Sequence, residues 1–342
     1  MQFGLFGGAG IAPAGPDVDG GHGFQEYVDF IIEAEKLGYC STFVVEHHFT
    51  GGGDLSASLN LLTWLGARTS TIRLGTAVIV LPWHNPVLLA EQVATLDVLT
   101  GGRVDFGVGK GYRHNEFAGF CVPIEESAER FEEALDVIVR SWTSGQRFSH
   151  HGRYWRFEDI IVGPPVTQSP HPPIWMGAGS PESITAVAER GYNLLLDQFA
   201  TIDVIGERIS IFRREVERRG RAFDPASVAV ARSVHVARNR ADTEAAHERR
   251  LLAQTRLIEN STANGKANTA SIMAFANTRE ASEEAALYGT PDEIAVKLDR
   301  LRSFGAEYIL MAAAGRSLTN LRRFASELMP HYGRTAPARA AM

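Results

Sequence analysis

Short apolar runs alternate with amphipathic stretches along the whole chain. The apolar runs predict eight strands, at 3–6, 42–45, 74–81, 104–108, 174–177, 193–196, 228–236 and 308–312. The stretches between them predict helices at 24–37, 57–69, 86–99, 127–143, 181–190, 203–219, 241–258, 291–303 and 319–330. Strands that are apolar throughout, rather than at alternate positions, indicate a parallel sheet covered by helices. Eight such repeats favour a closed (β/α)8 TIM barrel with insertions over an open doubly wound sheet.

Two segments interrupt this rhythm. Residues 146–173 are rich in aromatic residues and proline, which predicts a hairpin and a loop inserted before the fifth strand. Residues 259–289 are polar, rich in alanine and asparagine, and too long for a plain connection. Loops of that length in compact domains are usually functional, so we predict a mobile lid there. Both are read as insertions in a single domain that spans 1–342.

Composition narrows the class of protein. The chain has 342 residues, of which 44% are hydrophobic and 22% charged, as in a globular protein with a large core. Its net charge of −6 provides no basic excess for nucleic acid or an anionic membrane surface. Two cysteines, no leader-like N-terminus and no long apolar run suggest a protein of the cytoplasm, outside the membrane.

Polar residues cluster where predicted strands end, which is where barrel enzymes hold their active sites. The second strand ends in Glu46-His47-His48. Two adjacent histidines on an extended segment point to opposite sides, and no third ligand is evident, so a metal site is disfavoured. A satisfied structural cluster remains open, and acid–base work by one histidine is the favoured interpretation.

Two further strand ends suggest anion binding. Gly109-Lys110-Gly111 follows the fourth strand, where the glycines would let a ligand approach the backbone and the lysine would attract an anion. It lacks the spacing of a P-loop. Gly179 and Ser180 precede Pro181 at a helix start, and Ser183 lies one turn further on. This is either a plain capped helix or a phosphate site.

The chain resembles the bacterial luciferase-like flavin monooxygenases. The segment FVVEHHFT is similar to a luciferase α-subunit pattern, and the longest signature of the family is matched by GTAVIVLPWHNPVLLAEQVATLDVLTGGRVDFGVGKG. PPIWMGAGSPES and YGTPDEIAVKLDRLRSFGAEYILM match later motifs, in the same order. The resemblance covers 1–332.

The resemblance implies roles for particular residues. His47 would serve the chemistry beside the flavin, with His48 as its neighbour. Glu46 could orient His47, although the alternation of side chains along a strand could equally point Glu46 into the barrel wall. Ala77-Val78 matches the place of a non-proline cis peptide against the flavin ring. The remaining cofactor-binding candidates are Gly109, Lys110, Gly111, Gly179, Ser180 and Ser183.

Departures from the luciferase pattern limit the expected chemistry. Gly109 stands where luciferase has a reactive cysteine, and Ser127-Ala128 replaces a serine–arginine pair, leaving Arg130 as a possible phosphate contact. We therefore expect no light emission. Trp83, Tyr112 and Phe199 are candidates to line a substrate pocket.

As the family implies, reduced FMN would react with O2 to form a C4a-peroxyflavin that oxygenates a small apolar organic substrate. No dinucleotide fingerprint is present, so a separate NAD(P)H-dependent flavin reductase would supply the reduced FMN. The family also suggests a homodimer. Alternatives are a deazaflavin-dependent hydride-transfer enzyme, a non-catalytic flavin-binding subunit and, outside this family, a metal-dependent barrel hydrolase.

Overall fold

The computed structural model describes residues 1–9, 22–50, 54–261, 270–313 and 317–333. The contacts among them define two units. Unit 1 comprises Met1–Gly7, Asp29–Phe43 and the described residues from Trp175 onward, and unit 2 comprises the described residues of 8–28 and 44–174. The expected single domain that spans 1–342 stays a prediction.

Unit 1 is built on a parallel sheet whose strands run in the order β8, β9, β10, β12, β1 and β2. Their bounds are β8 Ile174–Gly177, β9 Asn193–Leu196, β10 Val228–Val236, β12 Tyr308–Ala313, β1 Gln2–Gly7 and β2 Ser41–Val44. The first and last of the predicted strands therefore pair, with Phe3 opposite Ile309. A further strand, β11 (Leu287–Gly289), extends the sheet beside the end of β10.

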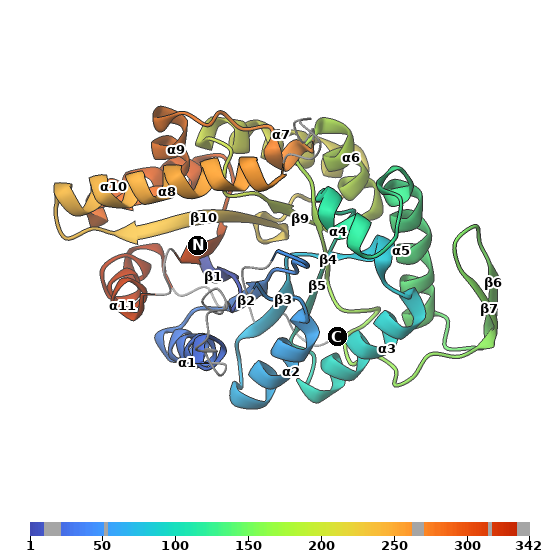
Figure 1. The fold of residues 1–342 in the computed structure, drawn as a ribbon. Coiled ribbons are helices and arrows are strands. Elements are labelled where there is room, and N and C mark those ends of the chain that lie inside the picture. The colour runs from blue at the N-terminus through green and yellow to red at the C-terminus, as the bar shows by residue number, and fades with distance from the viewer. Residues whose placement is uncertain (10–21, 51–53, 262–269, 314–316, 334–342) are drawn as a thin grey trace, which may run out of the picture. The chain divides into compact units, whose positions relative to one another are not determined.

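The helices of unit 1 follow its strands. They are α6 (Pro181–Arg190), α7 (Ile202–Arg218), α8 (Arg240–Ser261), α9 (Arg279–Ala285), α10 (Pro291–Ser303) and α11 (Leu318–Glu327), and α1 (His22–Leu37) is shared between the units. Figure 1 shows α8, α9 and α10 together along one side of β10. Helix α10 starts at a capping box of Thr290 and Glu293, with Pro291 at its first position.

Unit 2 has three parallel strands and four helices among its described residues. The strands are β3 (Arg73–Thr76), β4 (Ile79–Val80) and β5 (Val104–Gly109), and both β3 and β4 pair with β5. The helices are α2 (Ser58–Arg68), α3 (Pro86–Leu99), α4 (His114–Gly119) and α5 (Ser127–Thr143). Short 3-10 turns, η1 (Leu81–Trp83) and η2 (Ile124–Glu126), precede α3 and α5.

The segment 74–81, which the apolar pattern predicts as one strand, is divided. Pairing with β5 runs through Gly75 and resumes at Ile79. Between them, the hydroxyl of Thr76 donates to the Gly107 carbonyl at 2.7 Å and accepts from the Gly107 amide at 2.9 Å. The Thr76 side chain thus replaces the backbone hydrogen bonds between the strands at this point. A pattern of apolar residues cannot predict such an interruption of a strand.

The other predicted strands begin and end within one residue of the observed ones, and the predicted helices within three. In the segment 146–173, β6 (Phe148–His151) and β7 (Arg156–Ile160) form an antiparallel hairpin, as the sequence predicts (Figure 1). No helix among the described residues is long and apolar enough to cross a membrane.

The expected lid is only partly a loop. Helix α8 continues to Ser261, α9 occupies Arg279–Ala285, and Leu287–Gly289 is the buried strand β11. Residues 262–269 lie outside the described residues. The prediction of a lid through residue 289 is therefore wrong at its far end, because three apolar or small residues there complete the sheet.

Gly107 has no room for a side chain. A Cβ at this position would lie 1.7 Å from the Thr76 carbonyl oxygen, so backbone would have to move. We predict that Gly107→Ala lowers the free energy of unfolding by at least about 2 kcal/mol, measured by urea titration. Gly8→Ala is the matched control, because its Cβ would meet Leu55 at an ordinary 3.4 Å. Equal stability of the two variants would contradict this account of β3 and β5.

Candidate functional site

The predicted site residues fall into two groups, one in each unit. Unit 2 holds the segment that follows β2, the peptide after β3 and the end of β5, that is Glu46-His47-His48, Ala77-Val78 and Gly109-Lys110-Gly111. Unit 1 holds the start of α6, with Gly179, Ser180 and Ser183.

Glu46 is a buried carboxylate at the centre of the group in unit 2. Its Oε1 accepts hydrogen bonds from His48 Nε2 at 2.7 Å, from His84 Nε2 at 2.9 Å and from Trp83 Nε1 at 3.1 Å. Its Oε2 accepts from the Val80 amide at 3.2 Å. The side chain, which is 3% exposed, therefore ties the segment after β2 to the segment that follows β4.

These contacts keep Glu46 ionised. Burial by itself would raise the pKa of Glu46, but hydrogen bonds from His48, His84 and Trp83 outweigh it and lower the pKa to about 2. A carboxylate can only accept, so both histidines present an Nε2–H to it. Glu46 is thus a fixed negative charge at neutral pH and not a proton donor.

His47 lies on the other side of the segment. Its Nδ1 is 3.1 Å from Glu116 Oε1, and its Nε2 is 3.2 Å from Arg113 Nη2. The suggested pairing of His47 with Glu46 is therefore wrong. Successive side chains of an extended chain alternate, so Glu46 and His48 share one side and His47 takes the other.

The partners of His47 define its tautomer. A guanidinium only donates, so Nε2 of His47 accepts from Arg113 and the ring proton resides on Nδ1, which donates to Glu116. Glu116 is 2% exposed and also accepts from the His48 amide at 3.0 Å. The imidazole is held between a buried carboxylate and a cation, an arrangement suited to moving a proton at Nε2.

The sequence reasoning did not identify Arg113 or Glu116 as site residues. Both follow the Gly109-Lys110-Gly111 segment, and α4 begins one residue after Arg113. Their position just after the end of a strand could have identified them as site residues, because the same position identified Lys110 as a candidate. Arg113 Nε is buried without a hydrogen-bond partner among the described residues.

The peptide bond between Ala77 and Val78 is cis, which confirms the expectation drawn from the resemblance. The Ala77 amide donates to the Val44 carbonyl at 2.7 Å, so this peptide lies beside the end of β2. A Cβ on Gly109 would approach the Val78 side chain to 2.5 Å. Glycine at this position therefore allows β5 to pack closely against Val78.

Lys110 and Gly111 continue from β5. Lys110 is exposed, so its ammonium is free to attract an anion from solvent. Gly111 has a φ of +77°, and a Cβ there would lie 2.6 Å from Val80. Its conformation and its contact both require glycine.

Aromatic rings pack against the polar residues of unit 2. Trp83 stacks on Phe120, with ring centroids 5.1 Å apart, and meets Phe117 edge-on at 5.1 Å. The His48 ring contacts the Phe120 ring at 4.7 Å. Trp83 thus belongs to this wall together with Phe117 and Phe120, and its expected place in a substrate pocket stays a prediction. The wall limits water around Glu46 and His48.

In unit 1, Ser180 caps α6. Its Oγ accepts from the Ser183 amide at 3.3 Å, and Ser183 Oγ accepts from the Ser180 amide at 3.1 Å. The two serines therefore form a capping box, with Pro181 at the first helical position. The helix start retains the partial positive charge that favours an anion.

Arg208 adds a cation beside this helix start. A Cβ on Gly179 would lie 3.2 Å from Arg208 Nη2 and 2.9 Å from Ser271 Oγ. Arg208 Nη1 donates to Asp197 Oδ2 at 2.6 Å, and both side chains are nearly buried. Arg130, the alternative phosphate contact, instead pairs with Glu126 at 2.8 Å and lies over the Tyr154 ring.

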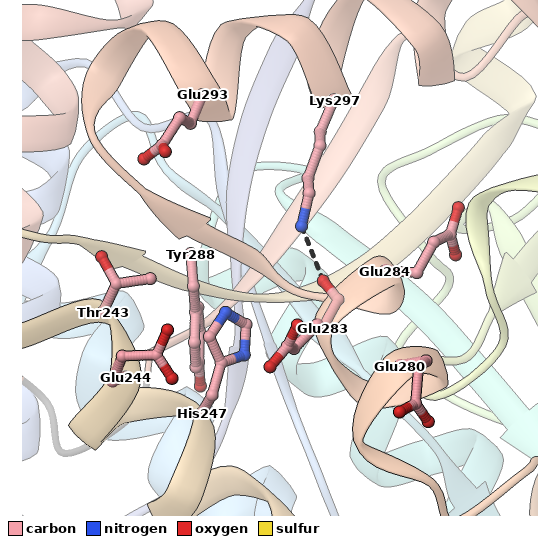
Figure 2. A pocket seen from close by; sticks show the side chains of 9 residues that line it. All are labelled: Thr243, Glu244, His247, Glu280, Glu283, Glu284, Tyr288, Glu293 and Lys297. Carbon is pink, nitrogen blue, oxygen red and sulfur yellow. Dashed lines mark hydrogen bonds between the residues drawn. The ribbon is translucent and has the colours of Figure 1, made fainter. Parts of the chain in front are cut away.

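A separate hollow of about 480 Å³ lies among α8, α9, β11 and α10 (Figure 2). Five glutamates, His247 and Lys297 are among its nine lining residues, and none of the predicted site residues is. The Lys297 ammonium donates to the Glu283 carbonyl at 2.6 Å, as the dashed line in Figure 2 shows. Within the described ranges, no group of His, Cys, Asp and Glu side chains has an arrangement that could hold a metal ion.

Comparisons with known proteins identify one family whose relatives use two kinds of cofactor. The model of the family described as "Luciferase-like monooxygenase" matches residues 1–308. The oxygenase component of a flavin-dependent trigonelline monooxygenase from Acinetobacter baylyi is 26% identical over 173 residues, 50% of this chain and 48% of that protein. An F420-dependent glucose-6-phosphate dehydrogenase from Microbacterium testaceum is 35% identical over 167 residues, 46% of this chain and 48% of that protein. The chain spans about half the length of these curated relatives.

Among solved structures, the monooxygenase RslO1 from Streptomyces bottropensis is similar with a TM-score of 0.83 at 24% identity, over 97% of this chain and all of that one. This likeness shows the fold, a (β/α)8 barrel with insertions, and so confirms the fold class that the strand pattern predicts.

The ionised state of Glu46 predicts a pH dependence. Because its pKa is lowered to about 2 from an ordinary 4.5, its contribution to stability is present above pH 4.5 and is lost as the pH falls through about 2. Between pH 6 and pH 3 the wild-type chain should lose about 2 kcal/mol more unfolding free energy than Glu46→Gln. Urea titrations at both pH values test this, and parallel losses in the two proteins would contradict it.

Proposed function

Because the chain belongs to the luciferase-like monooxygenase family, we propose that it is an FMN-dependent monooxygenase that inserts oxygen from O2 into a small organic substrate. The observation that carries the proposal is His47, held between the Glu116 carboxylate and the Arg113 guanidinium at a strand end. It gives unit 2 an oriented acid–base group, which oxygen chemistry on a reduced flavin requires.

Each unit holds residues that suit one part of a flavin mononucleotide. Its phosphate would bind at the start of α6, where Gly179, Ser180 and Ser183 offer the helix end and hydroxyls, and the nearby Arg208 supports a negative charge there. In unit 2, the exposed Lys110 is a further cation that would attract an anionic group. The ring would rest against Ala77-Val78, with backbone of Gly109 and Gly111 beside it. Reduced FMN, when bound, supplies the electrons that make O2 reactive.

The chain's own contribution is proton transfer and exclusion of water. His47 Nε2 takes up a proton or returns it, and the buried Glu116 carboxylate stabilises the imidazolium that results. Before Nε2 of His47 can take up a proton, Arg113 must stop donating its hydrogen bond to that nitrogen. Arg113 then has another partner in Glu116, because Arg113 Nη1 lies 3.8 Å from Glu116 Oε1. Glu46 fixes His48 and so keeps the segment in place, which makes it a positioning residue.

The proposal includes a separate NAD(P)H-dependent flavin reductase as partner. The trigonelline relative is itself named as an oxygenase component, which supports a two-component system. A homodimer in the cytoplasm remains part of the same prediction.

A deazaflavin-dependent hydride transfer is the second candidate function. It is favoured by the likeness to the F420-dependent dehydrogenase, whose identity of 35% exceeds that of the trigonelline relative. Such an enzyme needs a positioned acid–base group but does not use O2. The two candidate functions therefore differ in whether the reaction requires O2, which is easily measured.

Cofactor titration tests the choice. We expect the full chain to bind reduced FMN under anaerobic conditions with at least tenfold higher affinity than the deazaflavin, followed by fluorescence. With NADH, oxidised FMN and air the pure chain should consume no NADH, and adding a flavin reductase should start NADH consumption, because the reductase transfers the electrons of NADH to FMN and O2 then reoxidises the reduced flavin. Preferential deazaflavin binding, or NADH turnover without a reductase, would overturn the proposal.

His47→Gln tests the acid–base role. Loss of the imidazole should change the rate at which bound reduced FMN is oxidised by O2 by roughly 100-fold, without changing FMN affinity, in stopped-flow absorbance. His150→Gln is the matched control, because His150 also pairs with a glutamate, Glu133, at 3.0 Å but lies on the β6–β7 hairpin. An unaltered rate in His47→Gln would instead favour a non-catalytic flavin-binding subunit.

A further inference from the structure

Arg232 is a fully buried cation in the middle of β10, with 0% exposure. Its neighbour Ser233 accepts a hydrogen bond from Arg250 of α8, so Ser233 faces that helix. Side chains alternate along a strand, and Arg232 therefore projects from the opposite face of the sheet. There it is flanked along the strand by Val230 and Val234, which are also fully buried.

Among the described residues, one nitrogen of this guanidinium has hydrogen-bond partners and the other two have none. Arg232 Nη1 donates to the Asp197 carbonyl at 3.1 Å and to the Ala231 carbonyl at 3.2 Å. Nε and Nη2 are both buried and have no hydrogen-bond partner among the described residues. These two nitrogens form one edge of the planar group, and their N–H bonds point in the same direction.

Elsewhere in this chain the same edge binds carboxylates. Arg73 donates through Nε to one oxygen of Asp105 at 2.7 Å and through Nη2 to the other at 2.9 Å. Arg323 does the same to Glu327, at 2.8 and 3.0 Å. On the Arg232 edge, the part of the chain that the structure describes places no carboxylate.

Two carboxylates act on the charge of Arg232, those of Asp197 and Glu284, and both have other hydrogen-bond partners. Asp197 Oδ2 accepts from Arg208 and Oδ1 from the amides of Phe199 and Ala200, so only its backbone carbonyl accepts from Arg232. Glu284 accepts from the Ile202 amide at 2.7 Å and from Arg300 at 2.9 Å. Burial lowers the pKa of Arg232 to about 10, which still leaves it charged at neutral pH. Arg250, a second buried arginine, adds positive charge close by. Buried guanidinium N–H groups without an acceptor are costly, so the open Nε–Nη2 edge favours an anionic ligand.

We propose that Nε and Nη2 of Arg232 bind the carboxylate of the organic substrate, side-on and through two hydrogen bonds. The substrate is then an organic acid whose remaining body is apolar, in keeping with the valines beside Arg232. Calling this ligand the substrate rests on the proposed monooxygenase function. The binding of a carboxylate by Arg232 does not depend on that function. The other source of an oxyanion, the flavin phosphate, has its own candidate site at the start of α6.

Thermal unfolding of the full chain with matched probes tests the site. Benzoate and octanoate should raise the unfolding midpoint, and benzamide and octanamide, which have the same size but no charge, should not. In Arg232→Gln the dissociation constant for the acids should rise 10- to 100-fold, as expected for loss of a charge-assisted bidentate pair. Arg232→Lys keeps the charge but loses the pair of parallel N–H donors, so its dissociation constant for the acids should lie between those of the wild type and Arg232→Gln.

Arg323→Gln is the matched control, since its Nε–Nη2 edge is already occupied by Glu327, and it should respond to the acids as the wild type does. Equal effects of acid and amide, or an unchanged acid response in Arg232→Gln, would overturn the proposal. So would competition by inorganic phosphate together with a tenfold loss of reduced-FMN affinity in Arg232→Gln, which would assign Arg232 to the flavin. Acid binding that depends on Arg232 in a chain that binds no FMN would support the carboxylate site and refute the monooxygenase.

Discussion

The hydrogen bonds that converge on Glu46 decide the arrangement of the group in unit 2. One carboxylate accepts hydrogen bonds from three side chains and a backbone amide, which lie after β2, in β4 and after β4. With Glu46 turned to that side, alternation sends His47 to the other, where Glu116 and Arg113 hold its ring. The buried charge is therefore stabilised by the same contacts that orient the candidate acid–base group.

Glu46 and Arg232 are opposite solutions to the burial of a charge. Four donors surround the Glu46 carboxylate, three on Oε1 and one on Oε2, so its charge is stabilised without any ligand. Arg232 is equally buried, but two of its nitrogens face no acceptor among the described residues. In physical terms the first is a finished structural element, and the second is a group whose partner comes from outside the chain.

Much of the fold could be predicted from the sequence, because apolar runs and helix caps are local signals. The strands at 174–177, 193–196 and 228–236 agree with the structure residue for residue, and Pro86 and Pro181 do begin helices. The division of 74–81 was missed because it depends on Thr76 meeting Gly107, two residues on different strands. The lid was overextended because β11 is short and only its pairing with β10 identifies it.

The candidate site was predictable in part for the same reason. Strand ends marked Glu46 and His47, and the resemblance added the cis peptide at Ala77-Val78. Which carboxylate holds which histidine was not predictable, since Glu116 lies 69 residues beyond His47 in the chain. Arg232 gave no signal either, because an arginine inside an apolar run does not reveal whether its partner is a carboxylate or a ligand.

The most direct measurement is an anaerobic crystal structure of the full chain with reduced FMN. The account predicts the flavin ring against Ala77-Val78, the phosphate at Gly179-Ser180 and a free Nε–Nη2 edge on Arg232. A flavin bound elsewhere, or a phosphate seated on Arg232, would contradict it.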